Sequence, residues 1–124
     1  MPEHFDQFMS MNPESHHHPH ERLVAIIQNC EAVCEHMTTF LMRSHNPHMR
    51  MMQLQLLRDC ADVCGLTAKC IARMSPLAKC IANLCAYVCD MCGNECMKFP
   101  DPESQSCARI CHHCARECRM FAMM

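Results

Sequence analysis

Apolar and cysteine side chains recur along the chain with the spacing of one face of an α-helix. Each residue turns a helix by about 100°, so positions three, four and seven apart lie on the same side. Segments near residues 19–44 and 47–74 show this pattern, which predicts an amphipathic helix in each. The shared face of the first carries Leu23, Ile26, Ile27, Cys30, Cys34, Met37 and Leu41, and that of the second carries Met49, Leu56, Leu57, Cys60, Cys64, Ile71 and Met74.

Prolines separate the helical segments from one another. Proline is tolerated at the start of a helix and disrupts its interior. The prolines that divide the chain are Pro19, Pro47, Pro76 and the pair Pro100 and Pro102. With only two glycines and few β-branched residues, strands and hairpins have little support. The connections are very short, so the pattern predicts an all-α fold, an antiparallel up-down four-helix bundle over 19–124 with a Cys-lined core. Its helices are expected near 19–44, 47–74, 76–98 and 103–121.

Residues 1–18 form a polar lead-in to this bundle. Phe5, Phe8 and Met9 have helical spacing, which is compatible with a short amphipathic helix that docks on the bundle. A histidine cluster follows, and its composition leaves two interpretations open, recruitment of a metal ion and a solvated tail. The cluster consists of His16, His17, His18 and His20.

A cysteine motif of the form C-x-x-[VI]-C occurs once in each predicted helix, beginning at Cys30, Cys60, Cys85 and Cys107. In the last two helices it extends to C-x₃-C-x₂-C-x₃-C. Positions i, i+4, i+7 and i+11 stay within a narrow stripe of a helix. The thiols are therefore expected to point into the core.

The spacing of these pairs favours metal binding over disulfides within a helix. Cβ atoms four residues apart in a helix are separated by about 5 to 6 Å, whereas a disulfide requires about 3.8 Å; disulfides between helices remain open.

Soft thiolates favour Cu(I), Zn²⁺ or iron–sulfur clusters. A buried thiolate needs charge compensation. One Cu⁺ for each thiolate gives an array with almost no net charge, while a zinc site with four thiolates keeps a net charge of about −2. This argument predicts on the order of 12 to 14 Cu(I) ions per chain.

Two C-x-x-C strings, at 89–92 and 111–114, keep a second interpretation open. Such strings occur in zinc sites and in thioredoxin-type redox proteins. Each string lies inside a longer helical stripe of cysteines, and no strand is expected beside it. A zinc-binding or redox-responsive thiol protein is therefore the alternative to copper storage.

Composition and charge exclude several other classes of function. The chain has 14 cysteines among 124 residues, with 13 acidic and 11 basic side chains. No run of Lys or Arg suits phosphates, so we expect no nucleic-acid partner. No stretch has the length of a signal-peptide core or a membrane span, so we expect a protein of the reducing cytoplasm and no membrane partner. No catalytic constellation appears, and we expect no enzymatic activity.

The cysteine pairs on all four predicted helices, with the extended spacing in the last two, resemble the bacterial copper storage proteins. These are small four-helix bundles that bind many Cu(I) ions inside the bundle, and the resemblance covers about residues 20–121. It implies cytosolic storage and detoxification of Cu(I) by a homo-oligomer, commonly a homotetramer. The paired cysteines expected to bind metal are Cys30, Cys34, Cys60, Cys64, Cys85, Cys89, Cys92, Cys96, Cys107, Cys111, Cys114 and Cys118.

The up-down topology also predicts two different bundle ends. Methionines and histidines gather at the end that the thiols reach, so we expect copper to be taken up there, with Met37 and Met49 as further ligand candidates. These residues are Met37, Met42, Met49, Met52, Met97, His45 and His48. The opposite end is expected to be an apolar plug of Leu23, Ile26, Ile71, Met74, Leu77, Ile81 and Phe121.

Two cysteines fall outside the stripes. On regular helices Cys70 lies about 80° from the direction of Cys60, and Cys80 lies about 140° from that of Cys85. Three roles remain open for them: peripheral metal binding, contact with another subunit, and packing as inert thiols. Of the two, Cys70 is the better ligand candidate.

Overall fold

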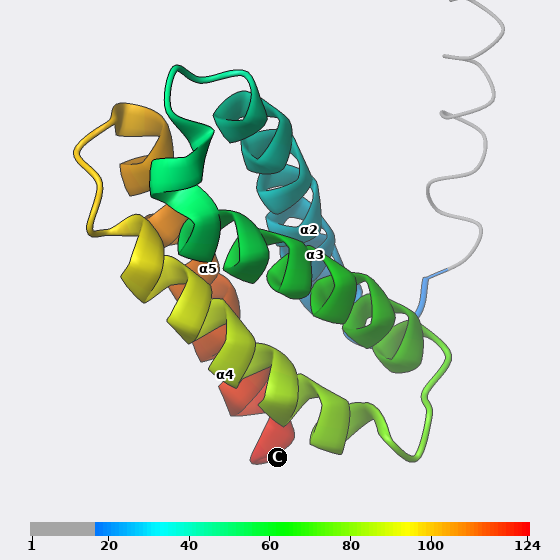
Figure 1. The fold of residues 1–124 in the computed structure, drawn as a ribbon. Coiled ribbons are helices and arrows are strands. Elements are labelled where there is room, and N and C mark those ends of the chain that lie inside the picture. Colours follow the sequence, from blue (N-terminus) through cyan, green and yellow to red (C-terminus); the bar gives the residue numbers. More distant parts are fainter. Residues whose placement is uncertain (1–16) are drawn as a thin grey trace, which may run out of the picture.

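The structure, a computed structural model, describes residues 17–124 and contains four long α-helices (Figure 1). The docking helix predicted around Phe5, Phe8 and Met9, and His16 with it, lie outside the described residues. Between 17 and 124 the chain forms no strand. The elements are α2 (Glu21–Met42), the short 3₁₀-helix η1 (Pro47–Arg50), α3 (Met51–Ala72), α4 (Ala78–Cys96) and α5 (Pro102–Ala122).

The four helices form an antiparallel up-down bundle, as predicted. Helix α2 packs against α3 and α5, and α4 packs against the same two helices, so the four axes enclose one central core (Figure 1). The α2–α5 seam is the least extensive of the four helix–helix contacts. None of the helices in the described part of the chain is long and apolar enough to cross a lipid bilayer.

Local sequence sets where the helices begin and end. Asp101 caps α5 by accepting a hydrogen bond from the Ser104 backbone N–H at 2.9 Å, and Pro102 occupies the first turn. Helix α3 ends at Ala72, and Met74 then adopts a left-handed conformation with φ of 53°. The chain turns away from the core at this point, so the prediction that Met74 lies on the cysteine face is wrong.

Small side chains allow the helices to approach closely. Alanines and one glycine lie buried beside the cysteines. At Gly93 of α4, a Cβ atom would lie only 2.8 Å from Nε2 of His112 on α5. A glycine is therefore needed at Gly93 for the His112 ring to pack at the α4–α5 seam.

Candidate metal centre

All twelve cysteines of the predicted stripes lie in the bundle core, each with no exposed surface. Helices α2 and α3 contribute two each, and α4 and α5 contribute four each. The helical periodicity thus predicted their location correctly. The cysteines are Cys30, Cys34, Cys60, Cys64, Cys85, Cys89, Cys92, Cys96, Cys107, Cys111, Cys114 and Cys118.

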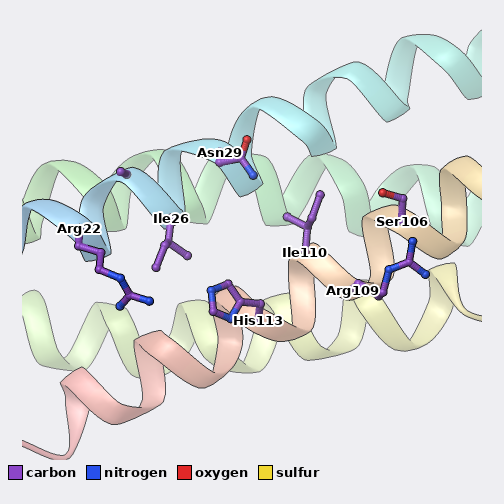
Figure 2. Close-up of a pocket in the computed structure, with 8 residues that line it drawn as sticks. Arg22, Ile26, Asn29, Ser106, Arg109, Ile110 and His113 are labelled. Atoms are coloured by element: carbon purple, nitrogen blue, oxygen red, sulfur yellow. The ribbon is translucent and has the colours of Figure 1, made fainter.

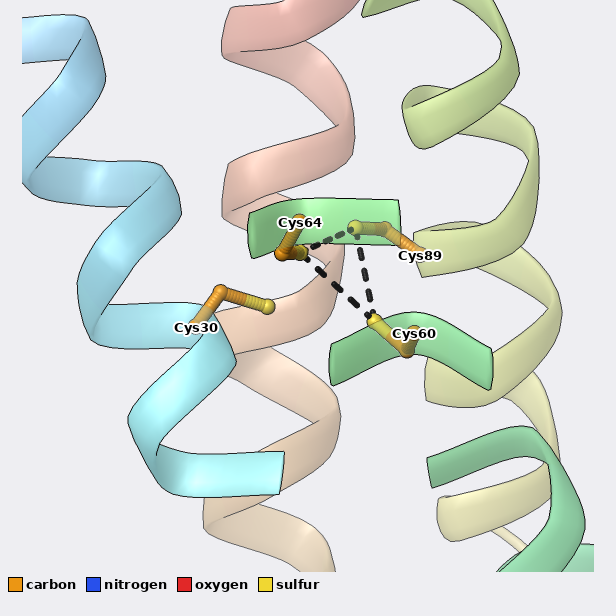
Figure 3. Close-up of side chains that lie close together, drawn as sticks. All are labelled: Cys30, Cys60, Cys64 and Cys89. Carbon is orange, nitrogen blue, oxygen red and sulfur yellow. Dashed lines mark hydrogen bonds between the residues drawn. The ribbon is translucent and has the colours of Figure 1, made fainter. Parts of the chain in front are cut away.

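The sulfur atoms from different helices lie in direct contact. Cys60 Sγ is 3.6 Å from Cys89 Sγ, and Cys64 Sγ is 3.7 Å from Cys89 Sγ (Figure 3). Cys64 Sγ also lies 3.8 Å from Cys85 Sγ. On the other side of the core, Cys111 Sγ lies 3.8 Å from Cys34 Sγ. All 14 cysteines are free thiols in the structure, so these contacts join unbonded sulfurs.

The thiols form three groups of four whose sulfurs all lie within 4.8 Å of one another. Each group draws on at least three helices, and each shares two members with another group. Shared sulfurs suit thiolates that bridge neighbouring metal ions, because one sulfur then serves two sites. The groups are Cys30, Cys60, Cys64 and Cys89; Cys30, Cys34, Cys60 and Cys111; and Cys64, Cys85, Cys89 and Cys114.

Contact between thiols determines how their protons are shared. Hydrogen bonding with Cys107, followed by Cys30 and Cys34, raises the pKa of Cys111, and burial acts in the same direction. Hydrogen bonding with Cys111 lowers the pKa of Cys30 instead, and burial opposes this shift. Burial disfavours the charged form of all these thiols, so we expect neutral thiols in the metal-free core and release of their protons on metal binding.

Within residues 17–124, no cationic side chain is buried in the core to balance thiolates. Among residues 17–124, the buried polar side chains are Gln53, Thr67 and Ser104, all uncharged. A thiolate in such surroundings is unfavourable unless a nearby positive charge compensates it. The positive charge must therefore come from the bound metal.

A polar network lies at the end of the bundle where copper uptake was predicted. Gln53 of α3 is fully buried and donates hydrogen bonds to Cys96 Sγ at 3.4 Å and to Ser104 Oγ at 2.9 Å. Arg50 donates to the Gln53 side chain at 2.9 Å and forms an ion pair with Asp101 at 2.8 Å. We call Arg50, Gln53, Asp101 and Ser104 the polar cap. The sequence pattern did not predict the polar cap, because its members come from two stretches, 50–53 and 101–104, that are far apart in the chain.

The methionines predicted at this end separate into two environments. Met37 is 2% exposed and packs in the core, whereas Met49 is 69% exposed. The prediction that Met49 lies on the cysteine face is wrong, because residues 47–50 form a 3₁₀-helix whose tighter winding breaks the register with α3. Met42, Met52 and Met97 are also exposed.

The opposite end is closed by part of the predicted apolar plug. Ile71 and Phe121 are buried, and the Phe121 ring meets the ring of His20 edge to face at 4.9 Å between centroids. Leu77, like Met74, is exposed, so these two residues do not belong to the plug. Leu23, Ile26 and Ile81 are partly buried.

The two cysteines outside the stripes lie outside the thiol cluster. Cys70 is buried but separate from the main core, and Arg73 donates a hydrogen bond to its sulfur at 3.6 Å. Cys80 is exposed. Neither belongs to one of the three groups of four.

The fold and the thiol cluster together define a helical bundle built to hold several soft metal ions inside its core. The family model for the copper storage proteins matches residues 16–123, and the chain belongs to this family. It is similar to a Cu(I)-bound copper storage protein, BsCsp3, with 35% identity and a TM-score of 0.80, over 83% of this chain and 97% of that one. The metal-free copper storage protein 3 from Bacillus subtilis gives 35% identity and a TM-score of 0.78, over 83% and 98%. The uncharacterized cysteine-rich protein YhjQ from Bacillus subtilis is 37% identical over 78 residues, 63% of this chain and 72% of that protein.

Proposed function

We propose that this protein stores Cu(I), and so removes the free ion, by binding many copper ions to the core thiolates. One observation carries the proposal: buried sulfurs from four helices form overlapping groups in a core to which the described part of the chain contributes no cationic side chain. Similarity to a Cu(I)-bound storage protein supports the same metal. The role requires no catalysis, because the ion enters and leaves as Cu(I).

Charge balance favours copper over zinc in this core. A single group of four thiolates would suit tetrahedral Zn²⁺, but each such site keeps a net charge of about −2. Among the described residues no buried cation offsets that charge. One Cu⁺ for each thiolate leaves the core near neutral, which gives about 12 ions on the stripes and about 14 if Cys70 and Cys80 also bind.

The proposal extends to assembly and compartment. Fourteen free thiols fit a reducing compartment, and we place the protein in the cytoplasm. Resemblance to the family supports a homo-oligomer, commonly a homotetramer.

An anaerobic titration of the reduced protein with Cu(I), followed by gel filtration and metal analysis, tests the function. We expect about 12 to 14 copper ions per chain, against no more than about three Zn²⁺ in a parallel titration, since the core has three groups of four. Protein alkylated at every cysteine after unfolding is the control and should bind no copper. Binding of only three or four copper ions, with most thiols still reactive, would favour a zinc or redox role instead.

A further inference from the structure

The polar cap makes the bundle end a poor route into the thiol cluster. Gln53 is fully buried and hydrogen-bonded to Cys96, and Arg50 is hydrogen-bonded to Gln53, so a metal ion that reached Cys96 past these side chains would have to break those hydrogen bonds. Arg50 has no lone pair to offer a metal ion, and the amide oxygen of Gln53 is a hard donor that suits Cu(I) poorly. A route that leaves these hydrogen bonds intact must lie elsewhere.

The α2–α5 seam carries a groove that reaches the cysteine core from the side. One hollow of about 410 Å³ lies between the two helices and is lined by Ile26 and Asn29 of α2 and Ser106 and Ile110 of α5, among others (Figure 2). Ser106 and Ile110 also line the next hollow along the seam, of about 450 Å³. The two hollows thus form one groove along the least extensive seam of the bundle.

The second hollow is lined by side chains that can bind a soft metal ion. His36 and Met37 line it from α2, and Glu103 and Cys107 line it from α5. Met37 and Cys107 are buried, so they form the floor, while His36 and Glu103 are exposed at the rim. Imidazole, thioether and thiolate together favour Cu(I) over hard cations. A hollow on the α2–α3 seam offers Met42 and Met51, but no cysteine lines it.

The floor of this hollow is connected to the thiol cluster by sulfur contacts. Cys107 Sγ lies 3.9 Å from Cys111 Sγ, which in turn lies 3.8 Å from Cys34 Sγ and 4.0 Å from Cys30 Sγ. Cys30, Cys34 and Cys111 belong to one of the groups of four. A Cu(I) ion bound to Cys107 can therefore pass into the thiol cluster by a single ligand exchange.

We propose that Cu(I) enters the bundle through this lateral groove, with His36, Met37 and Cys107 as a transfer site. The proposal rests on the copper storage function proposed above. The His36 imidazole and the Met37 thioether bind Cu(I) as its bonds to the carrier break, and the carrier's ligand leaves free. Cu(I) then forms a bond to Cys107 Sγ and releases the imidazole and thioether, while the Cys107 proton passes to water at the mouth of the groove. Copper stays Cu(I) throughout, and Glu103 at the rim attracts the incoming cation.

The chain offers a matched control, because it has a second adjacent His-Met pair. His36 and Met37 lie at the groove, whereas His48 and Met49 are exposed at the bundle end. We would compare H36A/M37L with H48A/M49L in stopped-flow mixing under nitrogen, with Cu(I) delivered from its bicinchoninate complex. Leu replaces Met at nearly constant volume, so the fold should survive.

H36A/M37L should slow the first phase of copper uptake about tenfold, as for a barrier raised by about 1.4 kcal/mol, and H48A/M49L should leave it unchanged. Final capacity separates the two proposals. Full capacity with an unaltered rate in H36A/M37L, or a slower rate in H48A/M49L, overturns the lateral route alone. Failure of the parent protein to bind more than three or four ions overturns the storage function itself.

A second measurement does not depend on the variants. The protein is labelled with ¹³C at the methionine methyl groups and titrated with Ag(I), a d¹⁰ substitute for Cu(I), while NMR spectra are recorded. Below one equivalent of Ag(I), the Met37 methyl signal should shift before those of Met49 and Met52. An early shift of the Met49 or Met52 signal instead would place uptake at the bundle end.

Discussion

Replacing Cys89 and Cys111 together by alanine tests whether the core sulfurs act as one shared ligand system. Cys89 belongs to two of the three groups of four, and Cys111 belongs to the third, so the double variant removes a ligand from every group. Cys89 Sγ lies within 3.9 Å of three other sulfurs, those of Cys60, Cys64 and Cys85. Loss of two thiolates should lower copper capacity by about two ions if charge balance sets the number.

The same variant should also destabilise the apo-protein. Both sulfurs are fully buried, and each truncation leaves a small cavity that costs about 1 to 2 kcal/mol. The sum, about 2 to 4 kcal/mol, corresponds to a fall in melting temperature of about 10 °C or more for a chain of this size. Circular dichroism measures the melting temperature, and anaerobic titration against a Cu(I) chelator measures the tightly bound copper.

The control removes the same number of thiols from outside the cluster. Cys70→Ala with Cys80→Ala should leave the tightly bound copper of the core unchanged, because neither residue belongs to a group of four. If this control loses as much tightly bound copper as the core variant, or if the core variant loses none, the shared core is not the binding site.

Three further predictions concern the protein without metal. The reduced, metal-free chain should be helical by circular dichroism, since neutral thiols pack like small apolar groups; a coil spectrum that turns helical only with copper would contradict this. A thiol reagent should modify Cys80 rapidly and the other cysteines slowly, because Cys80 is exposed and they are buried; a Cys80→Ser variant that keeps the fast phase would disprove the assignment. Asp101→Ala should lower the free energy of unfolding in urea by about 1 to 2 kcal/mol at pH 7 through loss of the helix cap and ion pair. Burial alone would raise the pKa of Asp101, but hydrogen bonds from Ser104 and Arg50 lower it. This contribution is therefore present above the ordinary carboxyl pKa of about 4 and is lost as the pH falls through the lowered value, so the difference between parent and variant should shrink as the pH falls below about 4.

The sequence was sufficient to predict the helices and the location of the core thiols. Cysteine spacing such as that from Cys85 to Cys96 directly encodes a helix face, and short connections leave little choice of topology. These features depend on residues close together in the chain, so periodicity alone predicted them.

Features that depend on contacts between distant segments were not predictable in this way. The 3₁₀ turn at 47–50 exposes Met49, and the left-handed residue after α3 exposes Met74. The polar cap joins Arg50 to Asp101, two residues 51 positions apart, and no local pattern predicts such a pair. The lateral groove likewise exists only because α2 and α5, the first and last helices of the bundle, pack least extensively.

The sulfur contacts between helices mean that copper would act as a set of cross-links. An ion shared by Cys30 and Cys111 closes a loop between residues 81 positions apart, and one shared by Cys60 and Cys89 closes a loop of 29. By the chain-entropy estimate used for disulfides, each closure is worth about 4 kcal/mol. A filled chain should therefore resist unfolding and proteolysis far better than an empty one. Proteolytic degradation would then remove mainly chains that hold no copper.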